Sequence, residues 1–179
     1  MTRAVFVDKD GTLVENVPYN VDPARIALVP GAREALAAFA AAGWRVLVVS
    51  NQPGVALGRF PESALQGVAR RLRELLPRLD GCYWCPHAPD AGCACRKPAA
   101  GLLERAAREH GIDLAASWMV GDILDDVEAG RRAGCRTVLL DSGNETEWRI
   151  TPERVPDHVA YDWAGARSLV MAREALASS

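Results

Sequence analysis

Residues 3–14 read RAVFVDKDGTLV, an apolar run that ends in two aspartates one residue apart and continues into Gly-Thr. Residues 3–7 are almost entirely apolar, which is typical of a strand buried on both faces. Asp8 and Asp10 follow at the end of that strand, where burial and mutual repulsion disfavour two ionised carboxylates. The pair therefore needs a partner that offsets its charge, and the rest of the chain has to supply it.

The same alternation of short apolar runs and longer alanine-rich segments continues along the chain. Runs buried on both faces that alternate with helices indicate a mostly parallel sheet covered on each side. We therefore predict a three-layer α/β fold and a single domain over residues 1–179, with a Cys/His-rich loop inserted at residues 85–95 and a long exposed loop at 142–157. The predicted strands cover residues 3–7, 44–51, 117–122, 135–143 and 158–161, and the predicted helices cover residues 32–43, 62–76, 99–111, 125–134 and 162–177.

Composition and charge exclude several classes of partner. The chain has 179 residues, 49% of them hydrophobic, and a formal net charge of -2. A nucleic-acid or anionic membrane surface usually needs a basic excess, so we expect neither partner. The sequence shows no apolar run long enough to span a membrane, and acidic residues come too early for a signal-peptide core. We expect a cytoplasmic monomer whose partner is a small molecule.

Polar residues stand at the ends of the predicted strands. Asp8 and Asp10 follow the first strand, Ser50 lies at the end of the second, and Asp122 follows the run SWMVG. In parallel sheets, ligands bind in the crevice beyond the carboxyl ends of the strands. The sequence therefore predicts a binding site that collects these side chains.

The side chains at these strand ends match the needs of phosphoryl transfer. The reaction requires a nucleophile, a proton donor, a divalent cation and fixed donors around the transferred oxygens. Asp8 can attack phosphorus and form an aspartyl-phosphate, while Asp10 can protonate the leaving oxygen and later activate water. Asp122 supplies a further carboxylate, which suits Mg²⁺. Ser50 and Lys97 can hold and neutralise the phosphoryl oxygens.

Four short motifs carry a family resemblance. The segment DKDGTL, the strand-ending Ser50, Lys97 in CRKP and the segment GDILDD resemble, in matching order, the four motifs of the haloacid dehalogenase (HAD) superfamily. The resemblance covers nearly the whole chain and implies a Rossmann-like core and Mg²⁺-dependent phosphatase activity. It implies that Asp8 is the nucleophile, that Asp10 is the general acid/base, and that Ser50 and Lys97 stabilise the phosphoryl group. It also implies that Asp8, Asp122 and the backbone carbonyl of Asp10 bind Mg²⁺. Asp126 would orient Asp122 or a metal-bound water.

A second cluster of ligand-type residues lies between the second and third motifs. Cys85, His87, Cys93 and Cys95 form a C-x-H-x5-C-x-C arrangement in a loop dense with Pro and Gly. Four such ligands suit tetrahedral Zn²⁺, and a site filled by protein ligands is structural. The ion would fix the loop so that the Arg-Lys pair after Cys95 faces the crevice. A redox pair is the alternative, although the spacing is not C-x-x-C.

The zinc loop narrows the resemblance to one branch of the superfamily. This branch holds the heptose-bisphosphate and histidinol-phosphate phosphatases, which have no large cap domain. The segment SNQPGVALGRF at residues 50–60 is closer to the heptose enzymes. Leu57 and Ile123 depart from their pattern, since arginine and lysine are usual there. The resemblance implies substrate contacts for Asn16, Val17, Pro18, Tyr19, Asn51, Gln52, Pro53 and Arg96. Arg59 is the cation expected to replace the arginine that Leu57 displaces.

Two non-enzyme interpretations stay open at this point. One is a receiver-like module that accepts phosphate on an aspartate without turnover, and the other is a zinc-stapled interaction module with a solvated acidic cluster. Magnesium-dependent release of phosphate from a generic ester separates both from the enzyme. Among enzymes, a histidinol-phosphate phosphatase is the alternative to a heptose-bisphosphate phosphatase.

Overall fold

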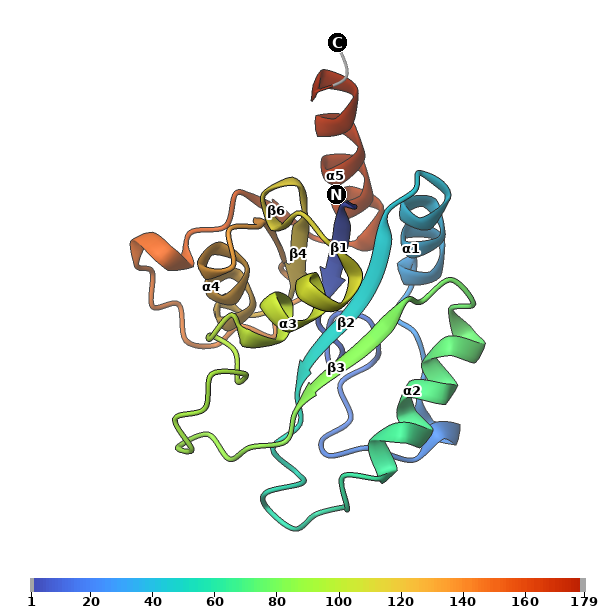
Figure 1. Ribbon diagram of the computed structural model, residues 1–179, viewed down its shortest axis with the longest axis vertical. Coiled ribbons are helices and arrows are strands. Elements are labelled where there is room, and N and C mark those ends of the chain that lie inside the picture. Colours follow the sequence, from blue (N-terminus) through green and yellow to red (C-terminus); the bar gives the residue numbers. More distant parts are fainter. Residues whose placement is uncertain (1, 178–179) are drawn as a thin grey trace.

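A six-stranded parallel sheet forms the centre of the molecule (Figure 1). The computed structural model describes residues 2–177, and the side chains of residues 2–172. The strand order is β3-β2-β1-β4-β5-β6. The strands are β1 (Ala4–Val7), β2 (Arg45–Asn51), β3 (Gly81–Cys85), β4 (Trp118–Gly121), β5 (Arg136–Leu140) and β6 (His158–Ala160).

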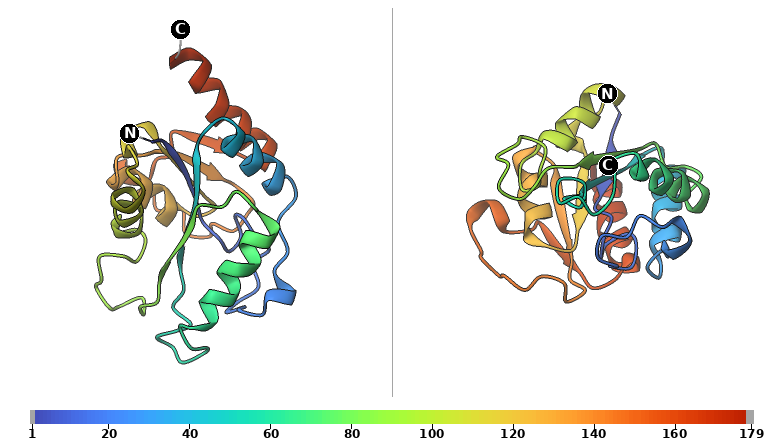
Figure 2. Two further views of the ribbon diagram at one scale, coloured as in Figure 1. Left: turned by 45° about the vertical axis from the view of Figure 1, so that its right-hand side comes forward. Right: turned by 90° about the horizontal axis from the view of Figure 1, so that it is seen from below.

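Helices cover both faces of this sheet (Figure 2). Side chains of α1 (Ala32–Ala41), α2 (Ala64–Leu75) and α5 (Trp163–Ala177) pack on one face, and those of α3 (Gly101–His110) and α4 (Leu124–Arg132) pack on the other. Short 3-10 helices are η1 (Pro23–Arg25), η2 (Leu114–Ala116) and η3 (Pro152–Arg154). Within residues 2–177, no helix combines the length and the hydropathy needed to cross a bilayer.

Strand β1 shows why the sheet lies between two layers. Ala4 and Phe6 pack toward α3, whereas Val5 and Val7 pack toward α1 and α5, and all four are fully buried. Successive side chains of a strand point to opposite faces, so a strand that is apolar at every position needs cover on both. The predicted three-layer α/β fold is confirmed.

The predicted elements agree with the structure apart from their ends and one strand. Residues 81–85 form β3, a strand at the edge of the sheet for which no bounds were predicted. Its residues are Gly, Cys, Tyr, Trp and Cys, so it lacks the aliphatic run that marks β1, β2 and β5. The exposed loop at residues 142–157 is present, interrupted only by η3, where Arg154 pairs with Asp125 and Glu128 of α4.

The order of the strands fixes the position of the site. The chain places β2 and β3 on one side of β1, then crosses over to place β4, β5 and β6 on the other side. A crevice opens beyond the carboxyl ends of the strands where the order reverses, here between β1 and β4. Asp8 follows β1 and Asp122 follows β4, so both carboxylates lie at this crevice.

Candidate active site

Lys97 connects two of the aspartates. Its Nζ lies 2.6 Å from Oδ1 of Asp8 and 2.6 Å from Oδ1 of Asp126, and it donates to the carbonyl of Val49 at 3.0 Å. The side chain is only 3% exposed. A buried ammonium held by two carboxylates and a carbonyl has a fixed position and keeps its charge. The structure thus brings the third motif against the first and the fourth.

Burial changes the acidity of these groups. It raises the pKa of Asp8 to about 7, although the charge of Lys97 opposes the change. Burial and the nearby Asp8 raise the pKa of Asp122 to about 6. Burial alone would lower the pKa of Lys97, but Asp126 and Asp8 outweigh it and raise that pKa. The ammonium is therefore permanent, whereas the carboxylates need a further positive charge to ionise fully.

Neutral donors hold the carboxylate of Asp122. Thr12 donates its hydroxyl to Oδ1 at 2.9 Å, and Asn144 donates its side-chain amide to Oδ2 at 2.7 Å. The turn after Asp10 comes close because Gly11 has a φ of 84° and no Cβ, which would lie 2.3 Å from Oδ2 of Asp122. The sequence reasoning missed Asn144, because it lies in the long loop and follows no strand directly.

Asp10 is bound on both carboxylate oxygens. The ammonium of the buried Lys9 contacts Oδ1, and Gln52 donates to Oδ2 at 3.0 Å. Gln52 also donates to the hydroxyl of Ser50 at 3.0 Å. Gln52 therefore links Asp10, the predicted general acid/base, to Ser50, which is predicted to donate a hydrogen bond to the phosphoryl group. The sequence analysis assigned no role to Lys9. Its position between Asp8 and Asp10 in the sequence is the signal that could have indicated one.

Two predicted site residues, Asn51 and Asp126, both bind Lys97. The Oδ1 of Asn51 accepts from the backbone N–H of Lys97 and its Nδ2 donates to the carbonyl of Lys97, both at 3.0 Å. This amide thus holds the backbone of Lys97. The carboxylate of Asp126 binds Lys97 and accepts from the N–H of Ile123 at 3.3 Å. Its place in the first turn of α4 directs it there, since such side chains fold back over the helix end. Its expected role of orienting Asp122 or a metal-bound water stays a prediction.

The residues expected to contact substrate lie mostly at the surface. Among those not described above, Asn16, Pro18, Tyr19 and Arg59 are exposed, and Val17, Pro53 and Arg96 are half-buried. The guanidinium of Arg59 lies 5.4 Å from the centre of the Tyr19 ring, so the loops after β1 and β2 are in contact. Among the described residues, the buried Nη1 of Arg96 has no hydrogen-bond partner. That donor is suited to an anionic ligand.

The carboxylate cluster fits a divalent cation. Asp8, Asp122 and Asp126 are buried and each offers an oxygen within 4.8 Å of the others. Three carboxylates face the single ammonium of Lys97, so the cluster carries more negative than positive charge. Mg²⁺ prefers carboxylate oxygens together with waters and substrate phosphate oxygens. All three carboxylates fit as its ligands, and Lys97 binds Asp8 and Asp126 at the same distance of 2.6 Å.

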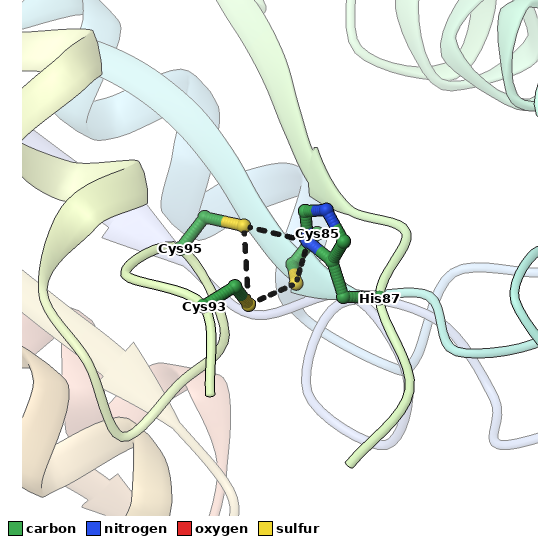
Figure 3. Close-up of side chains that lie close together, drawn as sticks. All are labelled: Cys85, His87, Cys93 and Cys95. Carbon is green, nitrogen blue, oxygen red and sulfur yellow. Dashed lines mark hydrogen bonds between the residues drawn. The ribbon is translucent and has the colours of Figure 1, made fainter. Parts of the chain in front are cut away.

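The four Cys/His ligand atoms form a compact group (Figure 3). The Nδ1 of His87 lies 3.5 Å from the Sγ of Cys85 and 3.2 Å from the Sγ of Cys95. The Sγ of Cys93 lies 3.6 Å from the Sγ of Cys85 and 3.6 Å from the Sγ of Cys95. A tetrahedral zinc with ordinary bond lengths separates two sulfurs by about 3.8 Å and sulfur from nitrogen by about 3.6 Å. A disulfide needs about 2.05 Å. The geometry fits zinc and excludes a disulfide between these sulfurs.

The fold and the carboxylate site define a phosphatase of the HAD type, and the chain belongs to the HAD-like hydrolase family. The HAD-hydrolase-like family model matches residues 94–166. A D-glycero-beta-D-manno-heptose-1,7-bisphosphate 7-phosphatase from Pseudomonas aeruginosa is 37% identical over 149 residues, covering 80% of this chain and 84% of the relative. This similarity favours the enzyme over both non-enzyme interpretations.

Solved structures give the same result. The D,D-heptose 1,7-bisphosphate phosphatase of Bordetella bronchiseptica, complexed with magnesium and phosphate, is 31% identical with a TM-score of 0.79, covering 96% of this chain and 99% of that one. A HAD-like phosphatase from Mesorhizobium loti is 34% identical, also with a TM-score of 0.79, covering 98% of this chain and 87% of that one. The similarity thus extends over nearly the whole chain.

The raised pKa values predict how stability depends on pH. Burial raises the pKa of Asp8 to about 7 and that of Asp122 to about 6 in the folded protein, from the ordinary value of 3.8. Between pH 3.8 and the raised pKa values, the two carboxyl groups bind more protons in the folded protein than in the unfolded chain. The free energy of unfolding therefore falls as the pH rises through this range. For Asp8 the loss is on the order of 2 to 3 kcal/mol between pH 5 and pH 8.

Urea unfolding of zinc-loaded, magnesium-free protein at several pH values measures this loss. Mg²⁺ requires ionised ligands, so adding it should reduce the loss and its affinity should rise from pH 5 to pH 8. The variant Asp8→Asn should show a shallower slope because it lacks the titrating group. An equal slope in that variant would contradict the assignment to Asp8.

Proposed function

We propose that this chain is a Mg²⁺-dependent phosphatase that removes the 7-phosphate of D-glycero-D-manno-heptose 1,7-bisphosphate through an aspartyl-phosphate on Asp8. One observation carries the proposal: Lys97 binds Asp8 and Asp126 at 2.6 Å each, beside the carboxylate of Asp122. This arrangement gives a carboxylate nucleophile, a fixed cation and a metal site in one crevice.

The first step forms the covalent intermediate. Lys97 holds Oδ1 of Asp8 and leaves Oδ2 to attack phosphorus. A bond forms between this oxygen and phosphorus while the bond to the ester oxygen breaks. Asp10, in its protonated form, gives its proton to the leaving alkoxide. The hydroxyl of Ser50 binds a phosphoryl oxygen, and the charge of Lys97, whose three N–H groups are held by Asp8, Asp126 and Val49, stabilises the negative charge on these oxygens.

The second step releases phosphate. Asp10, now ionised, accepts a proton from water as the water oxygen attacks phosphorus. The bond from phosphorus to Asp8 breaks, and the free carboxylate of Asp8 and inorganic phosphate result. Gln52 and Lys9 keep Asp10 in position through both steps, because they bind its two oxygens.

Each metal has a separate task in this proposal. Mg²⁺, when bound by Asp8, Asp122 and the backbone carbonyl of Asp10, offsets the charge of the carboxylates and of the substrate phosphate. Zn²⁺ on Cys85, His87, Cys93 and Cys95 is structural. The zinc loop packs tightly on the start of α3, since a Cβ at Gly101 would lie 2.3 Å from the carbonyl oxygen of Ala94. This packing sets the path of the chain from Cys95 to Lys97.

The substrate assignment has two supports. The relatives of similar length at about 35% identity are named as heptose-bisphosphate phosphatases, and the loop at residues 50–60 resembles theirs. The exposed Leu57 takes the place of an arginine in that loop, so we assign the distal phosphate to Arg59, which packs against Tyr19. Arg96 supplies a further cation.

A panel of phosphate esters tests the substrate. Catalytic efficiency should be highest for the heptose 1,7-bisphosphate, lower for a heptose 7-phosphate without the distal phosphate, and lowest for histidinol phosphate. Arg59→Gln should raise KM for the bisphosphate about tenfold or more and change the monophosphate little, because an ion pair to phosphate is lost only in the first case. Higher efficiency with histidinol phosphate would reverse the assignment in favour of the alternative.

A cytoplasmic location and a monomeric state stay predictions. No cysteine in the described part of the chain forms a disulfide. Thiols without disulfides are typical of reducing compartments, which supports the first of these predictions.

A further inference from the structure

We propose that Asn144 is a positioning residue for Asp122, which it orients for Mg²⁺ without neutralising its charge. This inference rests on the proposed function, since it concerns the metal site of that reaction. The loop that carries Asn144 follows β5, outside the four motifs that define the site.

The amide of Asn144 is placed to fix Asp122. Its Nδ2 lies 2.7 Å from Oδ2 of Asp122, 3.3 Å from the carbonyl oxygen of Gly11 and 3.0 Å from the hydroxyl of Ser142. The shortest of these contacts is the one to the carboxylate. A hydrogen bond to a charged group is stronger than one between neutral groups, so this contact dominates the orientation of the amide.

The two carboxylate oxygens of Asp122 accept hydrogen bonds from two segments that are far apart in the sequence. Thr12 donates to Oδ1 from the turn after β1, and Asn144 donates to Oδ2 from the loop after β5. With a donor on each oxygen, the carboxylate cannot rotate without breaking a hydrogen bond. Each oxygen still has lone-pair capacity for a cation.

The neutrality of Asn144 matters for the metal. A lysine or arginine at this place would offset the charge of Asp122 and compete with a divalent cation. An amide holds the carboxylate but leaves its charge in place. Partners of this type, which orient a metal ligand without touching the metal, typically change metal affinity by 10- to 100-fold.

The next residue fastens the loop in position. Glu145 accepts from the backbone N–H of Leu124 at 2.7 Å, at the first residue of α4. A carboxylate at this end of a helix is favourable because the first N–H groups have no partner inside the helix. Asn144 and Glu145 therefore bind on either side of the segment 122–124. The contact between Glu145 and α4 therefore fixes the part of the loop that carries the Asn144 amide.

Direct metal binding tests the inference. Mn²⁺ titration of zinc-loaded protein, followed by the EPR signal of free Mn²⁺, gives a dissociation constant without turnover. Asn144→Ala should weaken Mn²⁺ binding about 10- to 100-fold. With p-nitrophenyl phosphate, the Mg²⁺ concentration for half-maximal rate should rise by a similar factor, while kcat at saturating Mg²⁺ should change much less.

Ser142→Ala is the matched control. It removes another partner of Asn144 in the same loop and keeps the contact to Asp122, so Mn²⁺ affinity should stay within about twofold of wild type. Asn144→Ser, whose side chain is too short to reach Asp122, is a second variant that retains a polar residue should the alanine variant fail to fold. It should weaken Mn²⁺ binding as the alanine variant does.

The possible failures are distinguishable. If wild type binds Mn²⁺ and Asn144→Ala binds it equally well, the inference is wrong and the proposed function stands. A lower melting temperature of the magnesium-free variant with unchanged Mn²⁺ affinity would show a merely structural role, and would also overturn it. If wild type itself binds no Mn²⁺ outside the zinc site, the proposed metal site fails and the inference fails with it.

Discussion

Asp8→Asn should lower kcat for a phosphate ester by at least about 10⁴-fold, the size of loss seen when an enzyme loses its nucleophile. An amide has the same shape as a carboxylate but cannot attack phosphorus at a useful rate. The loss should appear in kcat at saturating substrate and Mg²⁺, because the rest of the crevice still binds the ester. Steady-state kinetics and trapping of the phosphorylated enzyme measure it.

The fold should tolerate this substitution. Burial already disfavours the charged form of Asp8, whose pKa is raised to about 7. Lys97 keeps its ion pair with Asp126 at 2.6 Å. At pH 8 without Mg²⁺, we therefore expect the free energy of unfolding to fall by no more than about 1 kcal/mol. Asp141→Asn, at the end of β5, is the matched control and should keep full activity. An Asp8→Asn variant with more than one tenth of wild-type kcat would move the nucleophile to another residue.

Cys95→Ser should lower the free energy of unfolding and the activity together. Serine is a poor zinc ligand, so the bound zinc should fall well below one ion per chain. The lost binding free energy is folding free energy, about 4 kcal/mol if free zinc exceeds the dissociation constant about 1,000-fold. Lys97 follows two residues later, and its displacement should lower kcat. Zinc analysis, urea unfolding and kinetics measure these effects.

A second cysteine gives the control for this variant. Cys82 is a free, half-buried thiol that packs against the core and lies outside the Cys/His group. Cys82→Ser should keep its zinc and lose only about 1 kcal/mol of stability. Full zinc occupancy together with unchanged unfolding in Cys95→Ser would refute the structural zinc site, whatever the activity of that variant.

The positions of the main site residues could be predicted because they are local features. Asp8, Ser50 and Asp122 each lie at the end of an apolar run, and a parallel sheet brings such ends to one edge. The Cys/His group is equally local, since its four ligands fall within eleven residues. No bounds were predicted for strand β3, because its residues, Gly-Cys-Tyr-Trp-Cys, contain no aliphatic run.

The contacts within the site are of a different kind. The amide of Asn51, a predicted substrate contact, also holds the backbone of Lys97. Asp126 was expected near Asp122 or a metal-bound water; its carboxylate lies within 4.8 Å of that of Asp122, and it also binds Lys97. Both residues stand where their motifs place them. Their partners depend on the packing of separate elements, which the spacing of residues along the chain does not encode.

The layered fold and the edge of the sheet that carries the chemistry can be read from short segments alone, and so can the ligand type at each strand end, because burial on both faces and residue type are properties of such segments. Which donor meets which carboxylate depends instead on how the folded chain packs. Asn144 reaches Asp122 from 22 residues away, and Lys97 reaches Asp8 from 89. A hydrogen bond forms only within a few tenths of an ångström of its ideal length, and the packing of the whole core sets distances on that scale.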